Sequence, residues 1–145
     1  MDRSGMTRDE VAAFIARRQQ DYDARNAAGL AADYTEDAVI QSPMAGSHSG
    51  RKAAQQAIEA TFNAFPDWKV TPQMLLIDGD RVVNIVTIEG THQGMFMGLP
   101  PSGKHFRSTA ALLYELRDGK IAGERRIYDF TGLLVQVGVL KARPA

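Results

Sequence analysis

Four strand-like runs follow one another in the second half of the sequence, and this succession limits the possible folds more than any other feature. The runs are rich in β-branched and aromatic residues and cover 68–77 (WKVTPQMLLI), 81–92 (RVVNIVTIEGTH), 104–116 (KHFRSTAALLYEL) and 120–129 (KIAGERRIYD). Two of the three junctions contain Asp-Gly, at 78–79 and 118–119, a pair typical of tight hairpin turns. The third junction, 93–103, contains glycine and proline and predicts a loop at the rim of the sheet. The second half is therefore predicted to form an antiparallel meander.

The first half of the sequence carries helical signals. Thr7 and Glu10 have the spacing of a capping box, which predicts that the first helix begins near Thr7. A stripe at helical spacing follows, and Gly29 is the predicted end of this helix. The stripe consists of Val11, Phe14, Ile15, Arg18 and Tyr22. Tyr22 is therefore predicted to lie on the buried face of the helix.

Two further helices are predicted before the meander. Residues 30–39 indicate a short helix that leads into a brief strand at 38–41 and then into a loop at 42–50. Residues 51–65 are rich in alanine and predict a third helix, whose inward residues are Ile58, Phe62 and Phe65. Helices followed by an antiparallel meander predict an α+β domain, in which the helices cover one face of a curved sheet.

The composition is typical of a single globular domain over residues 1–145, with 44% hydrophobic and 23% charged residues. Lysine and arginine number 17, as do aspartate and glutamate, so the net charge gives no reason to expect nucleic acid or an anionic membrane as partner. No apolar run approaches the roughly 18 residues of a membrane span. Cysteine is absent, which excludes disulfides. We therefore expect a cytoplasmic protein.

Asp129 lies between the last strand-like run and an apolar segment, 130–138, that looks helical. Aspartate is a preferred N-cap, so one interpretation is an exposed helix cap. Residues two apart on a strand share a face, so the other interpretation places Asp129 inward, on the same face as Arg125 and Ile127. We predict the inward orientation, which would put the carboxylate in a cavity. Such a carboxylate must be paired or protonated, because burying an unpaired charge is costly.

The three histidines are His48, His92 and His105, and their spacing matches no metal motif, so no metal site is predicted. His92 ends a strand beside the 95–97 rim, where its imidazole could reach a ligand. His48 lies in the loop before the third helix and has the weaker case. Residues 98–105 begin like a Walker loop, but His105 stands where the magnesium-binding serine or threonine belongs, so nucleotide binding is not predicted.

Methionine and aromatic side chains suit both core packing and the wall of an aromatic ligand's pocket, because they are adaptable or flat. The candidates are Met44, Met74, Met95, Met97, Phe65 and Trp68.

Four segments together resemble the SnoaL-like polyketide cyclase family, within the nuclear transport factor 2-like superfamily. They are DARNAAGLAADYTEDAVIQSP (23–43), AFPDW (64–68), GTHQGMFMGLPPSGK (90–104) and DGKIAGERRIYDFTGLLVQVG (118–138). The resemblance implies a cone-shaped, curved antiparallel sheet that wraps around the N-terminal helices and encloses a deep, mainly apolar pocket. It also implies a homodimer.

By position, the acid/base carboxylate of the family falls on Asp129. The resemblance implies that this group moves the proton α to a carbonyl and so promotes an intramolecular aldol ring closure without a cofactor. An apolar cavity raises the pKa of a carboxyl group and makes it a better proton acceptor. His92, Arg125 or Tyr22 could donate a hydrogen bond to the enolate.

The predicted catalytic residues are thus Asp129, His92 and Arg125, and the predicted ligand is a small hydrophobic or aromatic molecule. The predicted substrate-binding residues are Tyr22, Met44, His48, Phe65, Trp68, Met95 and Met97. Two alternatives remain open. One is an epoxide-hydrolase-like enzyme that uses an Asp129–Arg125 pair, and the other is a non-catalytic small-molecule-binding protein. We also expect a homodimer joined through the sheet, because the helices cannot cover all of its apolar residues.

Overall fold

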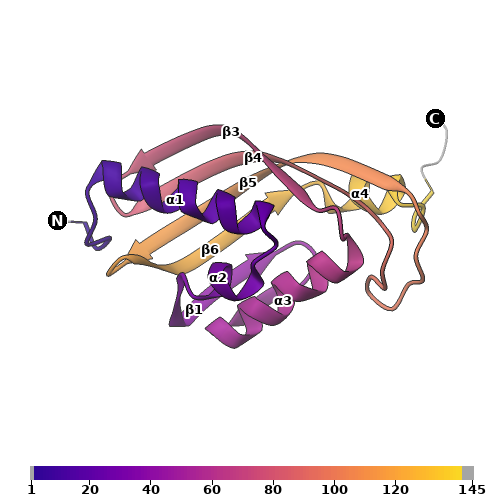
Figure 1. The fold of residues 1–145 in the computed structure, drawn as a ribbon, viewed down its shortest axis with the longest axis horizontal. Coiled ribbons are helices and arrows are strands. Elements are labelled where there is room, and N and C mark those ends of the chain that lie inside the picture. The colour runs from indigo at the N-terminus through magenta and orange to yellow at the C-terminus, as the bar shows by residue number, and fades with distance from the viewer. Residues whose placement is uncertain (1, 142–145) are drawn as a thin grey trace.

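The computed structural model describes residues 2–141 and consists of one six-stranded sheet with helices packed against it (Figure 1). The helices are α1 (Arg8–Asp23), α2 (Ala27–Ala31), α3 (Arg51–Ala64) and α4 (Phe130–Gln136). The strands are β1 (Tyr34–Ser42), β2 (Gly46–Ser49), β3 (Lys69–Asp78), β4 (Arg81–Thr91), β5 (His105–Arg117) and β6 (Lys120–Tyr128). No helix within the described range is long and apolar enough to cross a membrane.

The sheet has the strand order β2-β1-β6-β5-β4-β3. The predicted meander is confirmed, since β3 to β6 pair antiparallel with their neighbours and both Asp-Gly pairs form tight turns between Asp78 and Arg81 and between Arg117 and Lys120. The expectation of a purely antiparallel sheet is wrong in one place, because β1 pairs parallel with β6. This parallel pair joins the N-terminal third of the chain to its last strand.

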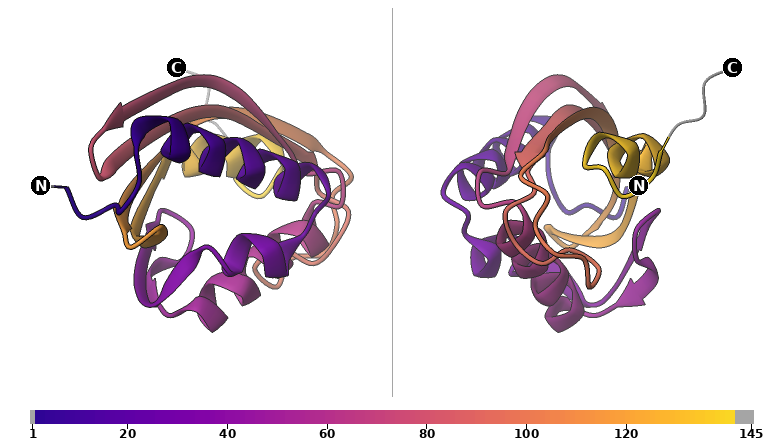
Figure 2. Two further views of the ribbon diagram at one scale, coloured as in Figure 1. Left: turned by 60° about the vertical axis from the view of Figure 1, so that its left-hand side comes forward. Right: turned by 90° about the vertical axis from the view of Figure 1, so that its right-hand side faces the viewer.

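The sheet curves around α1, α2 and α3, which lie on its concave side (Figure 2). The capping box at the start of α1 is confirmed: Thr7 accepts from the Glu10 amide, and the Glu10 side chain accepts from the Thr7 amide. The helix ends at Asp23, earlier than the predicted stop at Gly29. The reason is a second N-cap, Asn26, whose side chain accepts from the Gly29 amide at 3.0 Å and starts α2.

Residues 46–49 were predicted to lie in a loop, but they form the edge strand β2. Gly46, with φ 67°, lies at the turn between β1 and β2, and glycine adopts this backbone conformation without strain. The register places Ile40 of β1 opposite His48 of β2. His48 therefore lies on a strand, next to a residue whose side chain is completely buried.

The convex face of the sheet carries exposed apolar side chains. Met74, Leu76 and Ile127 are each at least half exposed. On the concave face, β6 presents Glu124, Arg126 and Tyr128. The prediction for β6 had the two faces reversed.

Candidate active site

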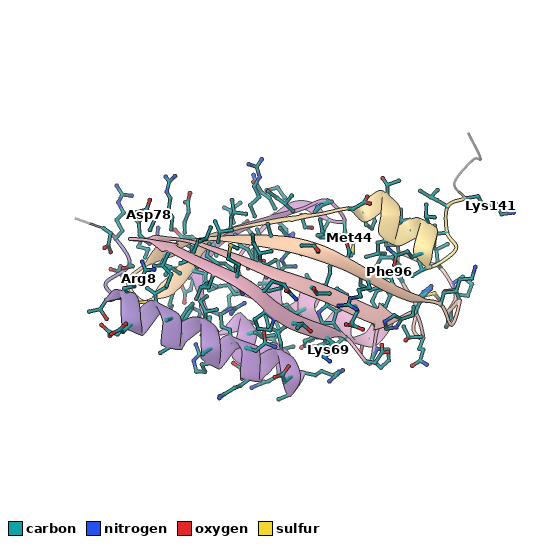
Figure 3. The ribbon with its side chains drawn as sticks, turned by 90° about the horizontal axis from the view of Figure 1, so that it is seen from above. Arg8, Met44, Lys69, Asp78, Phe96 and Lys141 are labelled. Carbon is teal, nitrogen blue, oxygen red and sulfur yellow. The ribbon has the colours of Figure 1, made fainter. Side chains whose placement is uncertain are left out.

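A cavity of about 260 Å³ lies between α3 and the concave face of the sheet. Its wall is formed by Tyr22, Ser42, Met44, Ala45, His48, Ala57, Ile58, Ala60, Thr61, Phe62, Trp68, Val70, Ile88, Met95, Phe96, Met97, Ala110, Leu112, Arg126 and Tyr128. Met44 and Phe96 lie toward the end of the sheet where Lys69 begins β3, away from Asp78 (Figure 3). This volume is slightly below the usual range of small-molecule sites, ~300–1000 Å³, and so fits a compact ligand.

The strand register brings His48, Glu124 and Arg126 to the same face of the sheet, near the cavity. Ile40 pairs with His48 on one side and with Glu124 on the other, and paired residues lie on the same face of a sheet. Arg126 follows Glu124 by two residues on β6 and so shares its face. The register thus brings a histidine, a carboxylate and a guanidinium to one region of the concave face.

Glu124 is the centre of a buried network of charges. Its side chain is completely buried, and it accepts hydrogen bonds from the Tyr34 hydroxyl and from Nε of Arg126. Nη2 of Arg18 lies 3.4 Å from the same tyrosine hydroxyl, and Nη1 of Arg18 donates to Asp33 at 2.8 Å. Two arginines and two carboxylates therefore balance one another inside the fold, which is the condition for burying such groups.

Three tyrosine rings surround the Arg18 guanidinium. The rings of Tyr22, Tyr34 and Tyr114 have centroids 5.8, 5.3 and 5.6 Å from its central carbon. A cation close to aromatic rings is stabilised by their quadrupoles, most strongly where water is excluded. Because Tyr22 also lines the cavity, the buried network reaches the cavity wall through both Tyr22 and Arg126.

The network sets the protonation of its members. Burial on its own would raise the pKa of Glu124, but the charges of Arg126 and Arg18 and the hydrogen bond from Tyr34 outweigh burial, so the pKa is lowered. Burial, with the Glu124 carboxylate beside it, raises the pKa of the Tyr34 hydroxyl well above its usual value. Glu124 is thus an anion and Tyr34 a neutral donor at pH 7.

Arg126 is the one charged side chain in the cavity wall over residues 2–141. Its Nε donates to Glu124, whereas no hydrogen bond within the described chain involves its Nη1 and Nη2 atoms. The side chain retains 18% exposure. Arg126 can therefore offer two donors to an oxygen atom of a ligand.

His48 lies in the same wall of the cavity. Its Nε2 atom is buried, and no residue in the described range forms a hydrogen bond with it. Burial lowers the pKa of His48, the positive charge of Arg126 lowers it further, and Glu124 partly opposes this. The imidazole is therefore neutral at pH 7.

The expectation that Asp129 faces inward is wrong. β6 ends at Tyr128, and Asp129 is exposed and caps α4 by accepting a hydrogen bond from the Gly132 amide at 2.8 Å. Arg125 is exposed on the convex side, and no ion pair links it to Asp129 within residues 2–141. The reason is that the buried Glu124–Arg126 pair turns the even-numbered residues of β6 inward. Of the three candidates Tyr22, Arg125 and Asp129, only Tyr22 therefore lines the cavity.

His92 is buried but lies outside the cavity wall. Its Nδ1 accepts from the Ser102 amide at 3.2 Å, and its ring packs against Phe65 and Phe96. Its backbone also bonds to Lys104 and Gly103. This arrangement ties the two ends of the 93–103 loop together. Phe65, predicted to bind substrate, is completely buried in the same aromatic cluster and does not line the cavity.

The other predicted substrate-binding residues do line the cavity: Tyr22, Met44, His48, Trp68, Met95 and Met97. Their role in binding stays a prediction. Arg126, Glu124 and Tyr34 were not predicted as site residues from the sequence. One sequence signal pointed to the buried network: Arg18 lies in the apolar stripe of the first helix. An arginine on a buried face requires a buried acid as its partner.

Comparison with known proteins agrees with this architecture. A model of the family described as SnoaL-like polyketide cyclase matches residues 13–137. The chain belongs to this family. It is 30% identical over 131 residues to the nogalonic acid methyl ester cyclase of Streptomyces nogalater, a match that covers 88% of this chain and 91% of the relative.

Two solved structures extend the comparison. AclR, a proposed hydroxylase from Streptomyces galilaeus, superposes with a TM-score of 0.82 and 25% identity, covering 95% of this chain and 87% of that chain. IdmH, a proposed polyketide cyclase from Streptomyces antibioticus, superposes with a TM-score of 0.73 and 28% identity, covering 88% of this chain and 97% of that chain. The α+β fold with a curved sheet is thus that of the SnoaL-like family.

Proposed function

We propose that this SnoaL-like protein binds a compact polyketide-type carbonyl compound in the cavity and promotes its aldol-type ring closure through an enolate. The observation that carries the proposal is Arg126, a cation with two unused donors in an otherwise mostly apolar wall. Such donors stabilise an oxyanion best where water is excluded. The similarity to a nogalonic acid methyl ester cyclase supports the same class of reaction.

Glu124 orients the Arg126 guanidinium for binding the oxyanion. The bond between Nε of Arg126 and the Glu124 carboxylate fixes one edge of the guanidinium plane, so the remaining nitrogens keep one direction. Trp68 and Phe62 offer flat surfaces for the carbon skeleton of a ligand. An aldol closure then needs only proton transfer besides the oxyanion site.

The resemblance assigns the proton transfer to Asp129, whose carboxylate is exposed and next to Tyr128 of the cavity wall. For Asp129 to act as general acid/base, the reacting carbon must extend past Tyr128 to the rim. The Asp129→Asn variant tests this role. A loss of turnover with unchanged binding would support chemistry at the rim, whereas retained turnover would place the base inside the cavity.

The proposed function is tested with nogalonic acid methyl ester as substrate. Arg126→Lys should lower kcat by about 10-fold to 100-fold, because lysine keeps a positive charge beside Glu124 but lacks the second donor pair. Binding can be followed separately through the fluorescence of Trp68, the single tryptophan of the chain, which lies in the cavity wall.

Arg125→Lys is the matched control, because Arg125 precedes Arg126 on the same strand but is exposed on the opposite face. It should leave kcat and binding unchanged. Equal activity of the Arg126→Lys and wild-type proteins would contradict the proposal. Binding without turnover in the wild-type protein would favour the non-catalytic binding protein instead.

We further expect a homodimer joined through the convex face of the sheet. Met74, Leu76 and Ile127 are exposed there, and exposed apolar side chains on one face of a sheet are typical of a subunit interface. Sedimentation velocity at micromolar concentration should show a dimer, and Leu76→Glu should shift it to monomer. A wild-type protein that sediments as a monomer under these conditions would contradict this expectation.

A further inference from the structure

The Nε2 atom of His48 has no function in the structure described so far. Nε2 is buried in the wall of the cavity, and the described chain offers it no hydrogen-bond partner. A buried polar atom without a partner destabilises the fold unless a ligand forms the missing hydrogen bond. The same wall holds the unused Nη atoms of Arg126.

We propose that His48 is the general base of the reaction and that Arg126 holds the oxygen of the enolate that His48 generates. This assignment rests on the proposed function and deepens it. His48 and Arg126 lie on the same concave face, joined by the row His48–Ile40–Glu124 across β2, β1 and β6. The substrate class is a ketone with a hydrogen on the carbon next to its carbonyl.

The proton and the electrons balance within the cavity. The C–H bond α to the carbonyl breaks, its proton goes to Nε2 of His48, and its electron pair forms the enolate, whose oxygen accepts from Arg126. The enolate carbon then attacks the second carbonyl of the substrate and forms the new C–C bond. The alkoxide that results takes the proton back from the His48 imidazolium. No other reactant is consumed.

Two electrostatic effects act on this proton transfer. The low pKa of His48 keeps the imidazole neutral and able to accept a proton at pH 7. Once the proton has moved, the enolate lies between the imidazolium and Arg126, and this attraction offsets the repulsion between the two cations. Glu124 is a weaker candidate, because Tyr34 and Arg126 already occupy both oxygens of its carboxylate.

The test separates proton abstraction from ring closure. α-Tetralone, a bicyclic aromatic ketone, is incubated with the protein in D2O, and loss of its α-proton signal is followed by NMR against an enzyme-free sample. The wild-type protein should exchange the proton, and His48→Ala should exchange it at least about 100-fold more slowly. The affinity for α-tetralone, measured by Trp68 fluorescence, should change less than about 10-fold.

Added imidazole should restore part of the exchange in His48→Ala, because it can occupy the space of the missing ring, and a merely structural role would not allow this. His105→Ala is the control, since His105 is exposed and lies outside the cavity wall. Exchange that survives in His48→Ala, or that imidazole does not restore, overturns the assignment. A wild-type protein that neither exchanges α-tetralone nor cyclises nogalonic acid methyl ester overturns the proposed function itself.

Discussion

Glu124→Ala should lower the free energy of unfolding by about 3–5 kcal/mol, which is the usual cost of removing one partner from a buried ion pair. The variant leaves Arg126 without its only ion-pair partner in the described chain and leaves the Tyr34 hydroxyl without its acceptor. Urea unfolding followed by circular dichroism measures the change. Glu115→Ala is the control, because Glu115 is exposed on β5, and it should change the free energy by less than about 0.5 kcal/mol.

The same network predicts how the stability that the charge of Glu124 contributes depends on pH. The pKa of Glu124 is lowered in the folded protein, so its contribution to stability is complete above the pKa of an unfolded glutamate, about 4.3. The contribution disappears as the pH falls through the lowered pKa. The difference in stability between the wild-type protein and Glu124→Gln should therefore be constant near neutral pH and shrink in acid. A difference that is the same at all pH values would contradict a charged Glu124.

Gly94→Ala should both destabilise the protein and weaken ligand binding. A Cβ atom on Gly94 would lie 2.0 Å from the carbonyl oxygen of Asn63, and a backbone atom in the last turn of α3 cannot move aside easily. The amide of Gly94 donates to the Ala64 carbonyl at 3.0 Å and so holds the 93–97 segment against α3. We expect a loss of about 1–3 kcal/mol in the free energy of unfolding.

The effect on binding follows from the next residues of the chain. Met95, Phe96 and Met97 form part of the cavity wall, so displacing the segment removes that part of the wall. The Kd for α-tetralone, from Trp68 fluorescence, should rise about 10-fold, or 1.4 kcal/mol. Gly123→Ala is the control, because its added Cβ would meet only the Glu115 side chain, at 3.4 Å. Unchanged stability and affinity in Gly94→Ala would show that the segment is free to shift.

Local sequence signals predicted most of the fold. The capping box at Thr7, the alanine-rich helix and the two Asp-Gly turns each act over a few residues, so they can be read without knowing the partner elements. The strand β2 and the parallel pairing of β1 with β6 could not be read in this way. β2 is a short polar run without strand periodicity. The pairing of β1 with β6 depends on contacts between segments that lie far apart in the sequence.

The faces of β6 illustrate why the site was harder to predict than the fold. Alternation assigns residues to two faces but does not say which face is inside, and Ile127 favoured the wrong choice. The deciding interactions come from α1 and β1, through Arg18 and Tyr34. The predicted roles of Asp129 and His92 in catalysis, the homodimer and the cytoplasmic location stay predictions, whereas Arg125 is exposed and lies outside the cavity wall.

The parallel pairing of β1 with β6 also constrains the order of events during synthesis. β1 pairs with β2 on one side and with β6 on the other, and β6 is made only after residues 43–119 have followed β1. At about 5–20 residues per second this interval lasts several seconds. Throughout it, the apolar sides of α1 and α3 have no complete sheet to pack on, and β1 has an open edge on that side. The nascent chain is thus most vulnerable to aggregation before β6 emerges, and the cavity forms only when that strand is in place.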